Sequence, residues 1–193
     1  MMIPKFARLT LAILTTLSAA WPLFAQETTL RLDPQQTVVR FTLEATMHTV
    51  HGSFRMRSGA IRFNTATGAA SGTIVIDATS GESGNQKRDR NMHRSVLLSE
   101  RYPEVTFMPT RVVGAVAPQG ESSVQVEGVL RLIGNDHPIT LPFKVQMSGD
   151  ELNASTQFTI PYVAWGLKNP STFFLHVADK VELNIIAVGK LER

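Results

Sequence analysis

The stretch ITLPFKVQMS, residues 139–148, alternates between apolar and mostly polar side chains. Ile139, Leu141, Phe143, Val145 and Met147 have the same parity, so an extended backbone would point them all to one side. A period of two is typical of a β-strand that has one buried face and one face in water. The stretch therefore predicts a half-buried strand.

The same pattern recurs on both sides of this stretch, and turn signals separate the repeats. The apolar runs lie at Val39–Ala45, Val50–Met56, Ile61–Phe63, Thr73–Asp77, Val105–Phe107, Val124–Leu132, Leu152–Ile160 and Val181–Val188. The turn signals lie at Asp33–Pro34, Asn64–Gly68, Pro118–Gly120, Gly134–Pro138 and Ser148–Asp150. Many short strands at this spacing predict one all-β domain, either a closed barrel or a sandwich.

One segment, from about Gln86 to Glu100, breaks the period of two and is rich in Lys, Arg, Met and Leu. Asn85 suits the N-cap of a helix, and Tyr102-Pro103 would end it. We therefore expect one inserted helix of about four turns. A helix lying across the mouth of a barrel would act as a plug or a lid.

The composition is that of a globular protein, with 43% hydrophobic and 18% charged residues in 193. These values exclude a disordered chain. The sequence contains no cysteine, so it has neither a disulfide nor the lipid-modified cysteine of a bacterial lipoprotein.

Residues 1–25 have the features of a secretory signal peptide. Lys5 and Arg8 precede an uncharged run, Leu9–Ala20, and Ala25 is a small residue at the expected cleavage position. We expect a mature domain of residues 26–193, without a transmembrane segment, in the periplasm or outside the cell; an uncleaved N-terminal anchor is the alternative. The mature chain would carry 17 Lys and Arg against 16 Asp and Glu, which gives no basic surface for nucleic acid.

Several segments, taken in order, resemble the YceI-like family of exported lipocalin-like proteins. The resemblance runs from about Leu32 to Leu191. It rests on His48–Phe54, Ser58–Asn64, Arg88-Asp89, Tyr102–Phe107, Gly128–Leu130 and Gly134–Leu141. Residues Pro161–Ser171 depart from the family pattern Asp-Arg-x-x-Phe-Gly and retain only Gly166.

The resemblance implies a single antiparallel barrel of about eight strands that holds a polyisoprenoid or another long-chain, fatty-acid-like lipid. A barrel of this size is just wide enough for one slender ligand. The alternation alone is equally compatible with a barrel filled by its own side chains. The candidate lining residues are Phe41, Leu43, Phe54, Met56, Phe63, Phe107, Leu130, Phe143, Phe158 and Trp165.

Three polar residues are candidates for contact with a ligand head group. His48 would lie near a rim of the barrel, and Arg88 and Arg90 begin the expected helix. A guanidinium suits phosphate because it offers a fork of donors. The plain alternative is a solvated, charge-paired first helical turn.

The sequence gives no sign of a metal, a cofactor or a catalytic centre. His48 and His51 are three residues apart, which places them on opposite faces of a regular strand. The chain has no Gly-x-Ser-x-Gly run and no phosphate-binding loop. A lipid-binding protein is thus the first expectation. An enzyme acting on a bound lipid and a structural envelope-stress protein with a filled barrel remain alternatives, and a homodimer is left open.

Overall fold

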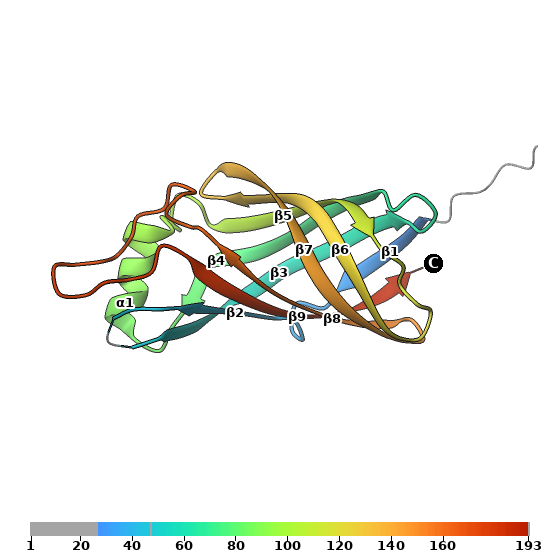
Figure 1. The fold of residues 1–193 in the computed structure, drawn as a ribbon, viewed down its shortest axis with the longest axis horizontal. Helices are drawn as coiled ribbons and strands as arrows, with labels where there is room; N and C mark the ends of the chain where they lie inside the picture. The colour runs from blue at the N-terminus through green and yellow to red at the C-terminus, as the bar shows by residue number, and fades with distance from the viewer. Residues whose placement is uncertain (1–26, 47, 193) are drawn as a thin grey trace, which may run out of the picture.

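The computed structural model describes residues 27–46 and 48–192, so the expected signal peptide at residues 1–25 lies outside the described residues. The described chain forms nine strands and one short helical segment (Figure 1). The strands are β1 (Glu27–Leu32), β2 (Val38–Leu43), β3 (Val50–Asn64), β4 (Ala70–Glu82), β5 (Glu104–Val113), β6 (Gly120–Leu132), β7 (Asn135–Ser148), β8 (Glu151–Ile160) and β9 (Val181–Glu192). The helical segment consists of α1 (Gln86–Asn91) and a π-helical turn, η1 (Met92–Val96).

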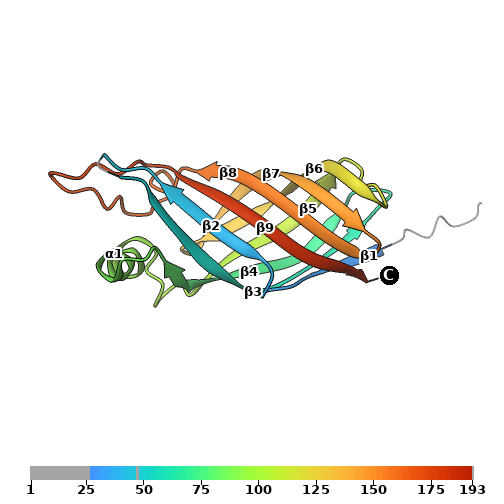
Figure 2. The same ribbon diagram turned by 90° about the horizontal axis from the view of Figure 1, so that it is seen from below.

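The strands close into an antiparallel barrel. From β2 to β9 each strand pairs with its neighbours in the chain, and β2 also pairs with β9. β1 lies between the same two strands as β2 but farther along them, because it pairs with the end of β3 and the end of β9. The barrel therefore has eight strand positions, one of them shared by β1 and β2 (Figure 2). The single antiparallel barrel of about eight strands is confirmed.

A short turn joins the two strands that share a position. The carbonyl of Asp33 accepts from the N–H of Thr37 (3.0 Å), and the Asp33 carboxylate accepts from the N–H of Gln35 (2.8 Å). This turn falls at the predicted Asp33–Pro34 signal. The alternating stretch, residues 139–148, lies in β7, where Leu141, Val145 and Met147 are buried.

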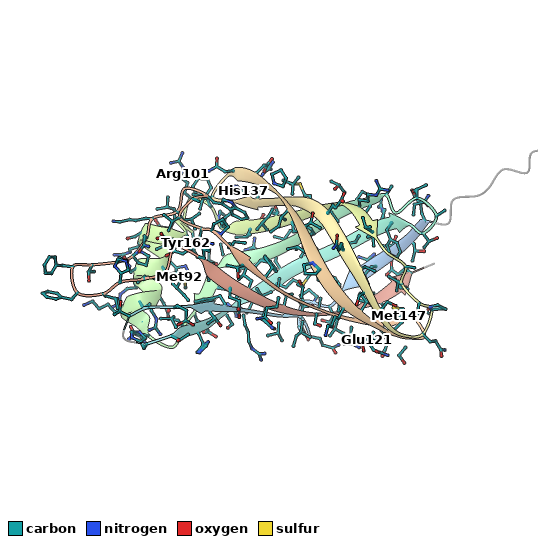
Figure 3. All side chains as sticks on the ribbon, in the orientation of Figure 1. Met92, Arg101, Glu121, His137, Met147 and Tyr162 are labelled. Atoms are coloured by element: carbon teal, nitrogen blue, oxygen red, sulfur yellow. The ribbon has the colours of Figure 1, made fainter. Side chains whose placement is uncertain are left out.

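The two ends of the barrel differ. The helical segment and the long β8–β9 connection, residues 161–180, lie at one end, hereafter the α1 end (Figure 1). The start of β1 and the end of β9 lie at the other end. Met92 and Tyr162 mark the α1 end, and Glu121 and Met147 mark the opposite end (Figure 3). Met147, at the opposite end, is only 3% exposed.

The helical segment is shorter than the sequence suggested. Asn85 caps α1 as expected, since its side chain accepts from the N–H groups of Lys87 and Arg88. The helix does not continue to Glu100: it widens into a π-helical turn and ends at Val96. Leu98 then takes a left-handed backbone conformation, with φ of 49°, which turns the chain out of the helix. Among the described residues no helix is long and apolar enough to cross a bilayer.

The predicted turn at Gly134–Pro138 is also shorter than expected. Ile133 and Gly134 both have positive φ, 46° and 82°, and form a two-residue hairpin turn. Asn135–Pro138 already belong to β7, where Pro138 pairs with Val129 of β6. Isoleucine rarely adopts positive φ, so the residue type at position 133 did not indicate that the turn begins there.

Candidate functional site

A cavity of about 790 Å³ fills the middle of the barrel. This volume lies in the range of small-molecule binding sites. The side chains of the described residues leave this space open, so the described chain is not a filled barrel. The inward faces of all nine strands contribute to the wall.

The wall is almost entirely apolar. Val39 and Val50 are buried on one side, and Val126, Leu141 and Val145 are buried on another. The polar lining residues other than Thr37 come from segments at the α1 end. These residues are His48, Ser83, Asn85, Lys87, Arg88, Asn91, Tyr162 and Thr172. The cavity therefore has a long apolar interior and one polar end.

The structure places nine of the ten candidate lining residues on the cavity wall. They are Phe41, Leu43, Phe54, Met56, Phe63, Phe107, Leu130, Phe143 and Phe158. Their inward orientation follows from the period of two, interrupted once in β3. The pairing of β3 with β4 shifts between Met56 and Ser58, so Met56 and Ile61 both line the cavity despite their opposite parity.

Two inward-facing glycines make room for aromatic rings of the wall. Gly52 of β3 pairs with Phe41 of β2, and a Cβ atom at Gly52 would overlap the Phe41 ring. A Cβ atom at Gly128 of β6 would likewise overlap the ring of Phe107 on β5. Each glycine thus leaves room for a neighbouring ring on the inner face of the sheet.

The helical segment covers part of the α1 end. Its residues Asn85, Lys87, Arg88, Met92 and Val96 all line the cavity. The segment is fastened to β4 by His93, whose Nε2 donates to the carbonyl oxygen of Gly81 (2.9 Å). Nδ1 lies 2.9 Å from the hydroxyl oxygen of Ser99. Both nitrogens of His93 are therefore occupied in holding the segment in place.

Arg88 brings a guanidinium to this polar end. Its Nε donates to the hydroxyl oxygen of Ser83 (2.7 Å) and one terminal nitrogen donates to the Ser83 carbonyl (2.7 Å). Within the described part of the chain no carboxylate lies within 4.0 Å of this guanidinium. Asp89 instead accepts from the N–H and hydroxyl of Ser83. Arg88 therefore has donors left over and no ion-pair partner there.

The other two head-group candidates differ in position. His48 lies between β2 and β3 and lines the cavity at the α1 end. Arg90 is exposed and is not part of the lining. The reason is the helical period, because two residues along a helix turn a side chain by more than half a revolution, away from the face that carries Arg88.

His48 and His51 lie on different faces of the barrel wall. His51 lies on the outer face, where Nδ1 is 3.2 Å from the hydroxyl of Thr42, and His48 lines the cavity. In residues 27–46 and 48–192, no group of three His, Cys, Asp or Glu side chains is placed to hold a metal ion.

The β8–β9 connection, residues 161–180, forms another part of the mouth. Pro170, Thr172 and Leu175 line the cavity, although the sequence singled out only Trp165 from this segment. Tyr162 is 4% exposed, and its hydroxyl donates to the carbonyl of Ala178 (2.8 Å). Burial, with a smaller contribution from the negative charge of Asp179, raises the pKa of Tyr162 to about 12.

The tenth candidate lining residue, Trp165, does not line the cavity. Its ring stacks on that of His137 in β7, with centroids 4.1 Å apart and planes inclined by 7°, and it is not part of the cavity wall. Gly166 follows with φ of 95°, and the stack on His137 places the indole beside β7. The departure from the family pattern in this segment was the available signal that its side chains are placed differently.

The chain belongs to the YceI-like domain family, which matches residues 30–188. No curated protein sequence matches significantly. Several solved structures share the fold. BcnA of Burkholderia cenocepacia has a TM-score of 0.66 at 19% identity, covering 81% of this chain and 98% of its own.

Two further structures are similar. A polyisoprenoid-binding domain from Saccharophagus degradans, implicated in plant cell wall breakdown, has a TM-score of 0.64 at 17% identity, and the match covers 84% of this chain and 98% of that one. The YceI protein of Campylobacter jejuni has a TM-score of 0.60 at 19% identity, with 77% and 88% covered. At these identities the likeness establishes the fold.

Proposed function

We propose that this protein binds one long-chain apolar lipid, such as a polyisoprenoid or a fatty-acid-like chain, inside the barrel. The observation that carries the proposal is the cavity of about 790 Å³ with its apolar wall. Transfer of an apolar chain from water into such a space is favourable by about 25 cal/mol per Å² of buried surface. The name of the Saccharophagus degradans domain, which shares this fold, states polyisoprenoid binding and supports this class of ligand.

The polar end of the ligand would lie at the α1 end. Apart from Thr37, the polar residues of the cavity wall lie at this end, which favours the orientation that places a polar ligand end there. Arg88 has free donors and no carboxylate within ion-pair distance among the described residues. A phosphate or carboxylate end group would supply the missing negative charge.

The proposal places the protein in the periplasm or outside the cell. Its support is the sequence of residues 1–25, where Lys5 and Arg8 precede the apolar run Leu9–Ala20. We expect the mature chain to begin near Gln26. An intact mass that still includes residues 1–25 after release from the periplasm would contradict the expected cleavage.

Binding, and not catalysis, is the activity that we propose. The polar lining residues of the α1 end include one histidine, His48. They also include Lys87 and Arg88, whose N–H donors suit recognition of a negatively charged group. The rival is an enzyme that acts on the bound lipid. Incubation with a radiolabelled isoprenoid phosphate, followed by chromatography, separates the two, because a carrier returns its ligand unchanged.

The decisive experiment combines identification of the ligand with titration. Mass spectrometry of organic extracts from the purified protein should reveal a long-chain lipid. Delipidated protein is then titrated with a radiolabelled isoprenoid phosphate. Phe143→Arg puts a charge on the apolar wall, and we expect it to weaken binding at least about tenfold.

A matched control uses the outer face of the same strand. Gln146 is exposed on β7, so Gln146→Arg adds the same charge outside the barrel and should leave the affinity unchanged. Circular dichroism establishes that both variants are folded. If the wild type binds no long-chain lipid, or if folded Phe143→Arg binds as well as wild type, the proposal is wrong.

Arg88→Gln tests the orientation of the ligand. It should weaken binding of the isoprenoid phosphate by about tenfold and leave binding of the uncharged isoprenol unchanged. An equal loss for both ligands would show that Arg88 stabilises the mouth and does not recognise the charge.

A further inference from the structure

The β8–β9 connection exposes two adjacent aromatic side chains. Phe173 is 95% exposed and Phe174 is 86% exposed, and their rings pack against each other with centroids 5.0 Å apart. Single apolar residues are common on protein surfaces, but two neighbouring aromatic rings at this exposure indicate an interaction surface.

The backbone holds these rings outward. The N–H of Thr172 donates to the carbonyl of Leu175 (2.9 Å), which makes Phe173 and Phe174 the two central residues of a tight turn. Below the turn, the Asn169 side chain donates to the carbonyl of Val177 (3.0 Å) and to the carboxylate of Asp179 (2.7 Å). These bonds join the two arms of the connection at its base, and the bond between Thr172 and Leu175 closes its tip.

The tip lies directly beyond the mouth of the cavity. Thr172 and Leu175, on either side of the two phenylalanines, line the cavity. In Figure 1 the connection, coloured red between β8 and β9, projects past the α1 end as the outermost part of the molecule. A surface that met Phe173 and Phe174 would thus also face the cavity mouth.

The charge around this mouth is positive. Residues 44–49, 83–101 and 161–180, the three connections that contribute to this mouth, together carry seven Lys and Arg and four Asp and Glu, a net of three positive charges. The rest of residues 27–193 carries ten Lys and Arg against twelve Asp and Glu. Aromatic side chains that enter the interface, together with basic residues that attract acidic headgroups, are the features of proteins that bind the surface of an anionic membrane.

We propose that the tip formed by Phe173 and Phe174 inserts into the surface of an anionic lipid bilayer, so that the cavity mouth opens onto the membrane. Lipid could then pass between bilayer and barrel without crossing water. The purpose of the docking rests on the lipid-binding function proposed above. The docking itself is a separate property and is measured separately.

The test uses protein purified after expression of the full chain, with sedimented vesicles of phosphatidylethanolamine and phosphatidylglycerol. We expect the wild type to bind these vesicles and to bind vesicles of phosphatidylcholine alone more weakly. The double variant Phe173→Ser, Phe174→Ser should lower the partition coefficient at least about tenfold. Val113, an exposed apolar residue at the end of β5 away from this mouth, provides the matched control. Val113→Ser should bind vesicles as the wild type does.

A second measurement reports insertion directly. In Phe174→Trp, lipids with brominated acyl chains should quench tryptophan emission more strongly than in the wild type, whose Trp165 stacks on His137. Titration with solubilised isoprenoid phosphate is unaffected by the serine variants if the cavity works as proposed. If the wild type does not bind solubilised isoprenoid phosphate, the result contradicts the lipid-binding function and leaves the docking untouched.

Three results would overturn the docking. One is a wild type that binds neither kind of vesicle, and another is equal binding by the serine double variant. The third is a wild-type dimer, seen by sedimentation, that the double variant abolishes while vesicle binding is absent; the tip would then contact a second copy of the chain.

Discussion

At the scale of single residues, Tyr162 is both buried and hydrogen-bonded through its hydroxyl. It is buried at the start of the β8–β9 connection, and its hydroxyl donates to the carbonyl of Ala178 near the end of that connection. One hydrogen bond therefore joins the two ends of a twenty-residue loop that carries the mouth of the cavity. Burial raises the pKa of Tyr162 to about 12.

Tyr162→Phe should lower the free energy of unfolding by about 1 kcal/mol at neutral pH, because the Ala178 carbonyl loses its donor. The raised pKa adds a dependence on alkali. A folded-state pKa near 12 against an ordinary value of 10 means that the stabilisation is fully present below pH 10 and is lost as the pH rises through 12. Urea unfolding across this range should show a smaller alkaline loss in Tyr162→Phe than in wild type. Equal alkaline losses would contradict the assignment.

The sequence predicts which residues point inward wherever a regular strand carries them. Phe41, Phe107 and Phe143 line the cavity because the period of two fixes the side of the sheet. Trp165 lies outside the strands, so no period applies to it, and a stack on His137 determines its position. Arg90 is close to Arg88 in the sequence, but the helical turn separates the two side chains, and only Arg88 lines the cavity.

At the scale of the element, the start of the helical segment can be predicted from the sequence, but its end cannot. Its start is predictable because an N-cap depends on one local residue type, and Asn85 accepts from the N–H groups of Lys87 (3.1 Å) and Arg88 (3.0 Å). Its end depends on packing. Ser99 bonds to His93, and His93 bonds to Gly81 of β4, so contacts across the fold decide where the helix stops.

Asn85→Ala should destabilise α1 locally by about 1 kcal/mol, because two N–H groups lose their acceptor. Hydrogen exchange at Lys87 and Arg88 should accelerate about fivefold, while exchange in β6 and β7 should stay unchanged. Asn91→Ala is the control within the same helix, since the Asn91 side chain makes no capping bond. Similar acceleration in both variants would show that the cap does not hold the segment.

At the scale of the whole molecule, the strands and their inward faces follow from the sequence, but the space between them does not. Alternation is identical in a filled and an open barrel. The difference arises from the size of the residues that meet at the centre, and these come from strands far apart in the chain. Ala154 of β8 and Ala187 of β9 pair with each other and both line the cavity, so this part of the wall is shallow.

Larger side chains on this wall test whether lipid binding requires the open cavity, because they fill the cavity and leave the barrel intact. In Ala154→Phe, Ala187→Phe, two rings enter an apolar volume of about 790 Å³ that can receive them. We expect the double variant to lose binding of long-chain isoprenoid phosphate by at least about tenfold, because the rings occupy the path of the chain. Its free energy of unfolding should be unchanged or higher by about 1–2 kcal/mol, because each ring buries apolar surface without displacing another side chain.

The pair Ser155 and Ile186 provides the matched control, since these residues are paired on the same two strands and both are exposed. Ser155→Phe, Ile186→Phe adds rings outside the barrel and should leave lipid binding unchanged. Destabilisation of the Ala154→Phe, Ala187→Phe variant by about 1–3 kcal/mol would mean that the rings overpack a space smaller than about 790 Å³. A stable Ala154→Phe, Ala187→Phe variant that binds lipid with wild-type affinity would contradict a lipid path along this wall, because the two rings occupy that part of the cavity.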